Sequence, residues 1–421
     1  MVYKHSLRVG SESSAMDRAF EAGQGIVRLA PTWVPRFFST PARRLRLHPE
    51  DYYPFGKGRG GIVERWMSST IRAHNGPLTG PHEGLSMVVD PDRGLVPFDE
   101  FVEHHGADVL GARIWKEYQG WPMYAKFFDN VDALPLHIHH NDEYAALLGK
   151  RGKPEAYYYP PELNNHLGAQ PISFLGLNPE TTVEEFKVRL ARFKEGGDNR
   201  ITELSRGYRT RLGTGWDIPA GILHAPASVC TYEPQAASDI QCMCESWSNG
   251  AEVPESSLWG DVPSGRRGDL DFIVELVDWE ANTDPRFLAN RFMVPIQTKQ
   301  STAEGESGFS ENWIVYRSSR FSSKELRVNP GASVVIHDVD AYGCVVLQGH
   351  GSMNAHQISA TTIIRFGELT SDEFFVSERA ASGGVRVHNN STTEPLVILK
   401  HFGPGNREHV ASADILPGGL S

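Results

Sequence analysis

The side chains that could do chemistry are densest in the stretch Leu134-Pro-Leu-His-Ile-His-His-Asn-Asp-Glu-Tyr. Within it, His137 and His139 are two residues apart. Alternate side chains of a β-strand point to the same face, so both imidazole rings would point in one direction. Two neighbouring imidazoles on a rigid strand make half of a metal site. His140 should face the opposite side of the strand, and we expect it to be exposed to solvent.

Two later stretches could complete this metal site. Glu155 ends a Lys-Pro-Glu motif that leads into three tyrosines, so its carboxylate could lie on a neighbouring strand. The Pro-Ala-Gly turn at 219–221 is followed by His224, and we expect the turn to direct that ring inward. Together with His137 and His139 they form a set of three histidines and one carboxylate. Such a set suits Zn²⁺, Mn²⁺ or Fe²⁺, whereas each histidine taken alone could be an ordinary hydrogen-bonded residue.

Most of the elements that must position these residues are predicted to be short strands. Runs of β-branched and aromatic residues lie between scattered turn residues, which include 41 Gly and 27 Pro, and this pattern is typical of all-β proteins. The clearest strand candidates are 61–67, 134–139, 157–159, 173–177 and 332–337. The sequence therefore predicts a mostly β fold.

A few helices are also predicted. The stretch 178–193 begins with cap-type residues and early acids, and Gly196-Gly197 follows its end. Its apolar residues recur at helical spacing. They are Val183, Phe186, Leu190 and Phe193. Stretches 98–105 and 269–279 are further helix candidates.

The chain divides into three segments by composition. Residues 1–50 contain many arginines and are interpreted as a solvated, partly irregular N-terminal arm, with a basic binding surface as the alternative. Residues 51–300 contain the metal-site motifs. The stretch 304–310 is rich in Gly, Ser and Glu and is interpreted as a linker or an exposed loop. Residues 310–405 contain only isolated histidines, so we expect a second β unit without a metal.

Composition excludes several classes of protein. The 421 residues carry a formal net charge of −11, which argues against nonspecific nucleic-acid binding. Apolar runs are too short to span a bilayer, and the first residues contain no apolar core of a signal peptide. The four cysteines are too few to staple a chain of this length. We therefore expect a cytoplasmic protein with reduced thiols.

The order of these motifs resembles the cupin superfamily, and specifically the type I phosphomannose isomerases. The resemblance covers roughly residues 50–300, with a looser match over 310–405, and it includes the spacing from Lys126 to His137. It implies two cupin-like jelly-roll barrels with a small helical insertion. The matching stretches are Gly60-Gly-Ile-Val-Glu-Arg-Trp-Met, Trp121-Pro-Met-Tyr-Ala-Lys-Phe-Phe-Asp, Leu136-His-Ile-His-His-Asn-Asp-Glu-Tyr-Ala, Gly152-Lys-Pro-Glu and Ile218-Pro-Ala-Gly-Ile-Leu-His-Ala.

The resemblance also implies roles for individual residues. Members of this family hold a zinc-type ion, and the matching ligand positions are His137, His139, Glu155 and His224. The family's active-site lysines match Lys126 and Lys153, and its early acid matches Glu64. These three residues would contact a small carbohydrate substrate or move protons. Zinc is the first candidate for the metal, with manganese and iron as alternatives.

This sequence departs from the family at four positions. His137 replaces a glutamine ligand and gives the three-histidine set of other cupins. Pro135 replaces a serine that helps to hold the sugar phosphate. When Gln-Cys-Met-Cys is matched to the family's Glu-Cys-Met-Ala motif, Gln241 replaces an acid and Ala251 replaces an arginine. The residues that could substitute for these two in space are Glu245, Arg266 and Arg267.

The predicted function is that of a metal-dependent aldose–ketose sugar isomerase, whose substrate carries or lacks a phosphate. This reaction needs a base poised near neutrality and an electrophile, and a metal can be the electrophile. One alternative is a metal-dependent oxygenase with three histidines and one glutamate. Another is a non-catalytic sugar-binding cupin, which Gln241 and Ala251 favour. The identity of the metal tests the first alternative, and activity on free sugars tests the second.

Overall fold

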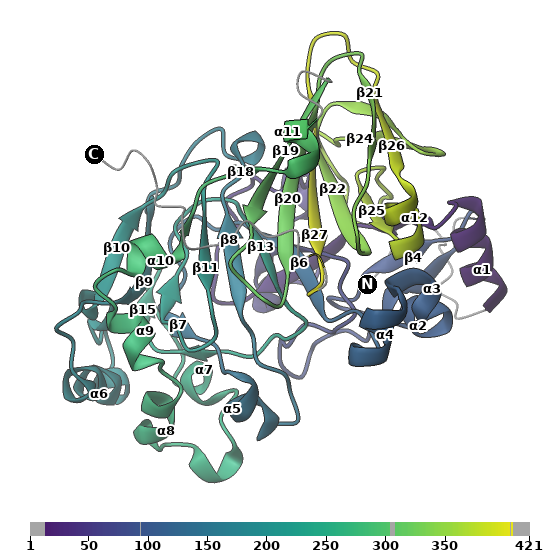
Figure 1. Ribbon diagram of the computed structural model, residues 1–421. Helices are drawn as coiled ribbons and strands as arrows, with labels where there is room; N and C mark the ends of the chain where they lie inside the picture. The colour runs from purple at the N-terminus through teal and green to yellow at the C-terminus, as the bar shows by residue number, and fades with distance from the viewer. Residues whose placement is uncertain (1–12, 93, 304–307, 405, 407–421) are drawn as a thin grey trace.

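The computed structural model describes residues 13–92, 94–303, 308–404 and 406. Within these residues the chain is mostly β, as predicted, and its large sheets are antiparallel and do not close into barrels. Figure 1 shows two groups of strands side by side, one in teal and one in yellow-green. Residues 304–307 of the predicted linker lie outside the described residues, and a strand begins at Phe309.

Two facing sheets form the unit that contains the predicted metal ligands. The larger sheet has seven described strands, in the order β17 (Phe292–Met293), β11 (Gly215–Ile218), β8 (Glu155–Tyr158), β13 (Thr231–Ala236), β6 (Met123–Phe128), β3 (Gly61–Met67) and β2 (Thr32–Arg36). The smaller sheet consists of β10 (Ser205–Arg209), β9 (Ile172–Leu177), β12 (His224–Ala225), β7 (His137–Ile138) and β14 (Cys242–Met243). A hairpin of β15 (Trp247–Ser248) and β16 (Ala251–Glu252) lies apart from them.

Two further sheets form the second unit. The nine described strands of its large sheet are β18 (Ile296–Gln297), β19 (Phe309–Val315), β20 (Ser322–Val328), β27 (Leu396–Phe402), β22 (Tyr342–Gln348), β25 (Glu373–Val376), β1 (Ile26–Ala30), β4 (Met87–Val89) and β5 (Leu95–Pro97). The small sheet contains β21 (Ser333–Ile336), β26 (Val385–Asn389), β23 (His350–Met353) and β24 (His356–Ser359).

The two large sheets pack against each other through one apolar face each. Ile62, Phe127 and Tyr232 of the seven-stranded sheet share a buried cluster with Val345 and Leu399 of the nine-stranded sheet. Because side chains alternate along a strand, the other face of the seven-stranded sheet is directed toward the five-stranded sheet. The metal-site unit therefore has its functional face on the side away from the second unit.

Helices cover the outer face of the five-stranded sheet and one end of the molecule (Figure 1). Those near the five-stranded sheet are α5 (Asp142–Ala146), α6 (Val183–Ala191), α7 (Ser256–Trp259), α8 (Leu270–Glu275), α9 (Trp279–Thr283) and α10 (Phe287–Arg291). The others are α1 (Ser13–Ala22), α2 (Phe98–His105), α3 (Ala107–Leu110), α4 (Ala112–Tyr118), α11 (Lys299–Ala303) and α12 (Glu378–Gly383). Among the described helices, none has the length and apolar content needed to cross a membrane.

The predicted helices are present, with shifted bounds. The helix predicted from residue 178 begins at Val183, because Thr182 and Glu185 form a capping box there. Phe186 and Leu190 are buried, whereas Val183 is exposed. The stretch 98–105 is α2 as predicted. The stretch 269–279 is only partly helical: α8 begins after its cap Asp269 and ends at Glu275, and α9 begins at Trp279.

The N-terminal residues are not a solvated arm in the described range. Strand β1 pairs with β25 in the nine-stranded sheet, and β2 pairs with β3 in the seven-stranded sheet. Arg36 and Arg44 are buried and pair with Asp239 and Asp129. The prediction of a solvated and irregular arm is therefore wrong here, because these arginines have buried acidic partners far along the chain. The nine-stranded sheet therefore contains strands from all three segments that were proposed from the sequence.

Candidate metal centre

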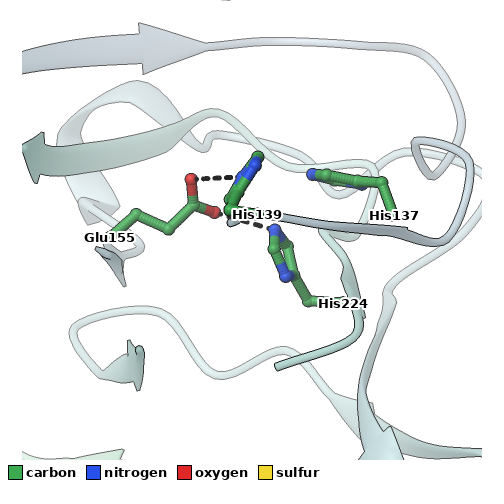
Figure 2. Close-up of side chains that lie close together, drawn as sticks. All are labelled: His137, His139, Glu155 and His224. Atoms are coloured by element: carbon green, nitrogen blue, oxygen red, sulfur yellow. Dashed lines mark ion pairs between the residues drawn. The ribbon is translucent and has the colours of Figure 1, made fainter. Parts of the chain in front are cut away.

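Four predicted ligands meet between the facing sheets of the first unit. His137 and His224 are paired opposite each other on β7 and β12 of the five-stranded sheet, and His139 follows β7. Glu155 begins β8 of the seven-stranded sheet. Figure 2 shows the four side chains converging, with ion pairs from Glu155 to two of the histidines. Their ligand atoms all lie within 4.8 Å of one another, so this group could hold a metal ion.

The contacts within the group are short and buried. Glu155 Oε2 lies 2.9 Å from His139 Nε2, and Glu155 Oε1 lies 3.0 Å from His224 Nε2. The ring centroids of His137 and His224 are 4.1 Å apart. None of the four residues is more than 4% exposed. The centre is therefore almost closed to solvent.

All three histidines are oriented by the same kind of contact. Their Nδ1 atoms lie 2.7 Å (His137) or 2.8 Å (His139 and His224) from a backbone carbonyl oxygen, which can only accept a hydrogen bond. Nδ1 therefore carries the proton, and Nε2 holds the lone pair that a metal requires. The carbonyls belong to Pro135 for His137, to Ile240 for His139 and to Ile222 for His224.

Electrostatics gives these ligands the protonation states that a divalent cation needs. Burial holds the pKa of His137 well below its usual value, and burial followed by the charge of Lys153 lowers the pKa of His139 to about 3. Burial alone would raise the pKa of Glu155, but Lys153 and the neighbouring histidines hold it well below its usual value. Neutral imidazoles beside one carboxylate are a typical zinc donor set.

Two unsatisfied atoms support the fit of this group to a cation. His224 Nε2 and Glu155 Oε1 are buried and make no hydrogen bond, although they lie 3.0 Å apart. Two lone pairs facing each other in a buried site are unfavourable unless a positive charge lies between or beside them. A divalent ion bound by these atoms would remove that penalty.

Lys153 brings a positive charge to two other ligand atoms of the group. Its Nζ lies 2.8 Å from His139 Nε2 and 2.9 Å from Glu155 Oε2. A metal ion at these atoms and the ammonium group would repel each other. Glu233, whose Oε1 lies 3.9 Å from Lys153 Nζ, is the carboxyl group toward which Lys153 would then turn.

A line of buried charges continues from the ligands across the seven-stranded sheet. Glu233 Oε1 on β13 lies 3.1 Å from Lys126 Nζ on β6. Lys126 Nζ lies 3.6 Å from Glu64 Oε1 on β3, and Glu64 Oε2 lies 3.0 Å from Arg36 Nη2 on β2. These strands are neighbours, and their side chains share the face directed toward the five-stranded sheet. The structure therefore places Glu64, Lys126 and Lys153 along one line of charges, and their roles toward a substrate stay a prediction.

Glu233 is the functional candidate that the sequence analysis missed. Burial and then the charge of Glu155 raise its pKa to about 8, although Lys126 and Lys153 oppose the shift. The assignment of the family's acid to Gln241 is not supported, because the Gln241 backbone N–H donates to Asp261 outside this charge line. The stretch Glu233-Pro-Gln-Ala has the acid and alanine of Glu-Cys-Met-Ala at the same spacing, and this signal could have identified it.

Glu64 has a different environment from Glu233. Its Oε2 accepts a hydrogen bond from Trp66 Nε1 at 2.7 Å and pairs with Arg36. Burial alone would raise the pKa of Glu64, but Arg36 and Lys126 together lower it. Glu64 is therefore a fixed anion that positions Lys126.

The remaining candidates make their described contacts outside the ligand group. The Glu245 carboxylate accepts a hydrogen bond from the Leu136 backbone N–H at 2.7 Å, so it supports the strand that carries His137. Ala251 is exposed in the β15–β16 hairpin. Arg266 and Arg267 lie at the turn before α8, where Arg266 pairs with Asp269.

The prediction that His140 is exposed is wrong. His140 is fully buried, and its ring centroid lies 6.2 Å from that of Phe272 on α8. Burial lowers its pKa to about 4. The ring does face away from the ligands, but α8 covers it, and the local pattern could not show this contact.

A cavity of about 540 Å³ lies at the Arg36 end of the charge line, where Asp239 is one of its lining residues. It is lined by parts of residues 71–79, 149–151 and 237–239. Arg72, Lys150 and Arg151 give it a basic wall, and Asp239 in the same wall pairs with Arg36 at the end of the charge line.

Comparison with known proteins identifies related structures but no related sequence. A scan of protein-family models gives no match to this chain, and a search of curated proteins also gives none. Among solved structures, the mannose 6-phosphate isomerase from Bacillus subtilis matches with a TM-score of 0.58 and 18% identity, covering 90% of this chain and 100% of that one. A variant of phosphomannose isomerase from Salmonella typhimurium matches with a TM-score of 0.62 and 10% identity, with the same coverage.

A mannose 6-phosphate isomerase bound with zinc and yttrium also matches, with a TM-score of 0.59 and 10% identity. It covers 90% of this chain and 99% of its own. Identities this low establish the shape of the molecule rather than its reaction. The chain has the mostly β fold of the phosphomannose isomerases, with a buried His137–His139–Glu155–His224 group between its first two sheets that could hold a metal ion.

Proposed function

We propose that the protein is a metal-dependent aldose–ketose sugar isomerase. The observation that carries this proposal is the position of Glu233, whose pKa is raised to about 8. Its carboxyl group lies 3.9 Å from Lys153 Nζ, which contacts the buried ligand group. Moving a proton between two neighbouring carbons needs a base with a pKa near the working pH. The match in fold to isomerases of mannose 6-phosphate supports the same class of reaction.

The metal would be held by His137, His139, Glu155 and His224. Zinc is the first candidate, with manganese and iron as alternatives. When bound, such an ion supplies Lewis-acid polarisation of the sugar's carbonyl and hydroxyl oxygens. The identity of the metal and a cytoplasmic location stay predictions.

The chain's own residues would manage the protons. The Glu233 carboxylate would remove the proton from C2 of an aldose, giving an enediolate, and would deliver to C1 a proton that can exchange with solvent while Glu233 holds it. The O2 hydroxyl proton would pass to O1, so the ketose forms with no net gain or loss of protons. Burial alone would lower the pKa of Lys126, but Glu233 and Glu64 raise it, so Lys126 stays a cation. Lys126 and Lys153 would therefore donate hydrogen bonds to substrate oxygens and orient Glu233, and Glu64 would hold Lys126 in place.

The proposed substrate is an aldose or ketose with or without a phosphate. Pro135 has no backbone N–H and no side-chain donor, so it cannot hold a phosphate as the serine of the family does. The cavity lined by Arg72, Lys150 and Arg151 offers cationic groups instead. A substrate panel must therefore contain both free and phosphorylated sugars.

The test is proton exchange followed by NMR in D₂O. The protein loaded with Zn²⁺ or Mn²⁺ is mixed with aldoses and ketoses, each with and without a 6-phosphate. We expect deuterium at C1 or C2 of one sugar, and no exchange in a His224→Ala variant. A metal-loaded protein that exchanges no sugar in the panel would contradict an isomerase. It would favour the oxygenase or the non-catalytic sugar-binding protein.

A further inference from the structure

A second group of metal-ligand side chains lies far from the centre described above. It contains Asp17 of α1 and His104 and His105 at the end of α2, whose ligand atoms all lie within 4.8 Å of one another. In Figure 1, α1 and α2 are at the right of the molecule, whereas β7 is at the left. The proposed isomerase reaction makes no use of this group.

Asp17 is the acceptor that both histidines face. Its Oδ1 lies 2.9 Å from His104 Nε2 and 4.0 Å from His105 Nε2. The two rings are close to perpendicular, with centroids 4.7 Å apart and an interplanar angle of 76°. An ion pair between Asp17 and His104 would explain the first distance but leaves His105 unexplained.

His105 supplies the independent observation. Its side chain is only 9% exposed, and its Nε2 atom is buried without a hydrogen-bond partner. The ring is held in place by aromatic neighbours, with centroids 4.7 Å from Phe20 and 4.6 Å from Phe101. A buried ring nitrogen is normally paired, so one that lacks a partner and faces a carboxylate points to a ligand.

We infer that Asp17, His104 and His105 form a second binding site for a divalent transition-metal ion of the zinc type. Two imidazoles and a carboxylate are suitable zinc donors, and the exposed side of Asp17 leaves room for water as a further ligand. A bound ion would give His105 Nε2 a partner. It would also replace the direct contact between Asp17 and His104 by one bond from each of these residues to the ion.

The site would fasten α1 to the body of the second unit. Helix α1 runs into β1, and α2 follows β5, so both helices lead to or from strands of the nine-stranded sheet. Asp17 and His104 are separated by 87 residues. A ligand that binds only the folded chain stabilises it by mass action, so zinc should stabilise this end of the molecule.

The test counts zinc ions bound per chain by equilibrium dialysis and elemental analysis of the untagged full-length protein. Four proteins are compared: the parent, His224→Ala, a His104→Ala/His105→Ala double variant, and the combination of all three changes. We expect two, one, one and no zinc ions, respectively. Equal zinc content in the His224→Ala protein and the combined variant would overturn the inference. The result does not depend on isomerase activity. The parent and the double variant differ only at the second site, and so do His224→Ala and the combined variant.

Two further variants separate a metal site from an ion pair. Glu103→Gln changes an exposed residue next to the site on α2 and should bind zinc like the parent. Asp17→Asn keeps the size of the side chain but loses its charge, and we expect at least about tenfold weaker binding at the second site. Zinc should also raise the melting temperature of His224→Ala but not that of the combined variant. An equal rise in both proteins would contradict the site.

Discussion

Two carboxyl groups on one face of the seven-stranded sheet differ in what surrounds them. Glu64 lies between Arg36 and Lys126, and these cations keep it ionised. Glu233 lies near the anion Glu155, which adds to the effect of burial in raising its pKa to about 8. Environment therefore gives the same kind of group opposite pKa shifts, and for this reason the proposed proton-transfer role is given to Glu233.

Replacing Glu233 by Gln should abolish proton transfer and leave the metal in place. The amide keeps the size of the side chain but cannot accept a proton, so we expect kcat to fall by ~10²–10⁴-fold. Elemental analysis should find the same zinc content as in the parent, because Glu233 is not among the four ligands. Unchanged exchange of the sugar protons in D₂O would rule out Glu233 as the base.

Replacing Lys153 by Met should separate metal binding from catalysis. Lys153 Nζ contacts ligand atoms of His139 and Glu155, so its removal relieves repulsion of a bound cation. We expect zinc affinity at least equal to that of the parent and a kcat lowered by about tenfold or more. Lys187→Met, at a partly exposed lysine of α6 outside both the ligand group and the cavity, serves as the matched control. Weaker zinc binding in Lys153→Met alone would show that Lys153 supports the ligands.

At the scale of elements, helix α9 positions the strand that carries His224. Asn282 of α9 donates to the Gly221 carbonyl oxygen at 2.7 Å and accepts from the Leu223 backbone N–H at 2.9 Å. It is fully buried, so these hydrogen bonds have no competition from water. The Pro-Ala-Gly turn is thus held in place by a helix more than fifty residues later in the chain.

Replacing Asn282 by Ala should disturb both stability and the metal site. The change leaves the Leu223 backbone N–H unpaired and removes one of the two hydrogen bonds to the Gly221 carbonyl, the other being donated by the Asp278 backbone N–H. It should lower the free energy of unfolding by about 1–3 kcal/mol. The looser turn should weaken zinc binding by ~10–100-fold, as for other residues that orient a metal ligand. Denaturant unfolding and zinc titration measure the two effects. Thr283→Ala, on the same helix, should leave zinc affinity unchanged.

At the scale of the whole molecule, buried charges join the two units. Arg65 of β3 donates to Asp372 at 2.7 and 2.9 Å and to Glu373 at 3.0 Å. One arginine thus faces two acids at the contact between the large sheets. Burial raises the pKa of Glu373 to about 8, although Arg65 opposes the shift.

This pKa shift makes stability depend on pH in a defined direction. Between the ordinary glutamate pKa of 4.5 and about 8, folded Glu373 keeps a proton that the unfolded chain releases. The free energy of unfolding should therefore fall as pH rises through this window, and the contribution is fully present only below pH 4.5. Glu373→Gln should flatten this part of the profile, measured by denaturant unfolding at several pH values. Glu368→Gln, at an exposed residue nearby, should leave the slope unchanged, and an equal slope in both variants would contradict the assignment.

Local sequence pattern was sufficient to place His137 and His139 side by side and to predict several elements. The spacing of His137 and His139 placed both rings on one face, because strand alternation acts over two residues. The helix over 98–105 has the predicted bounds. The fold class followed from the strand pattern and from the resemblance, although the sheets do not close into barrels in the described residues.

Only the tertiary structure decided which polar groups are buried and with whom they pair. Arg36 and Asp239 are 203 residues apart in sequence and form one buried ion pair. His140 was assigned to solvent because no local pattern shows that α8 covers it. Glu233 became a candidate base only when folding placed it beside Glu155, Lys126 and Lys153. Side-chain direction follows from backbone periodicity, whereas burial and charge pairing depend on residues that are distant in the chain.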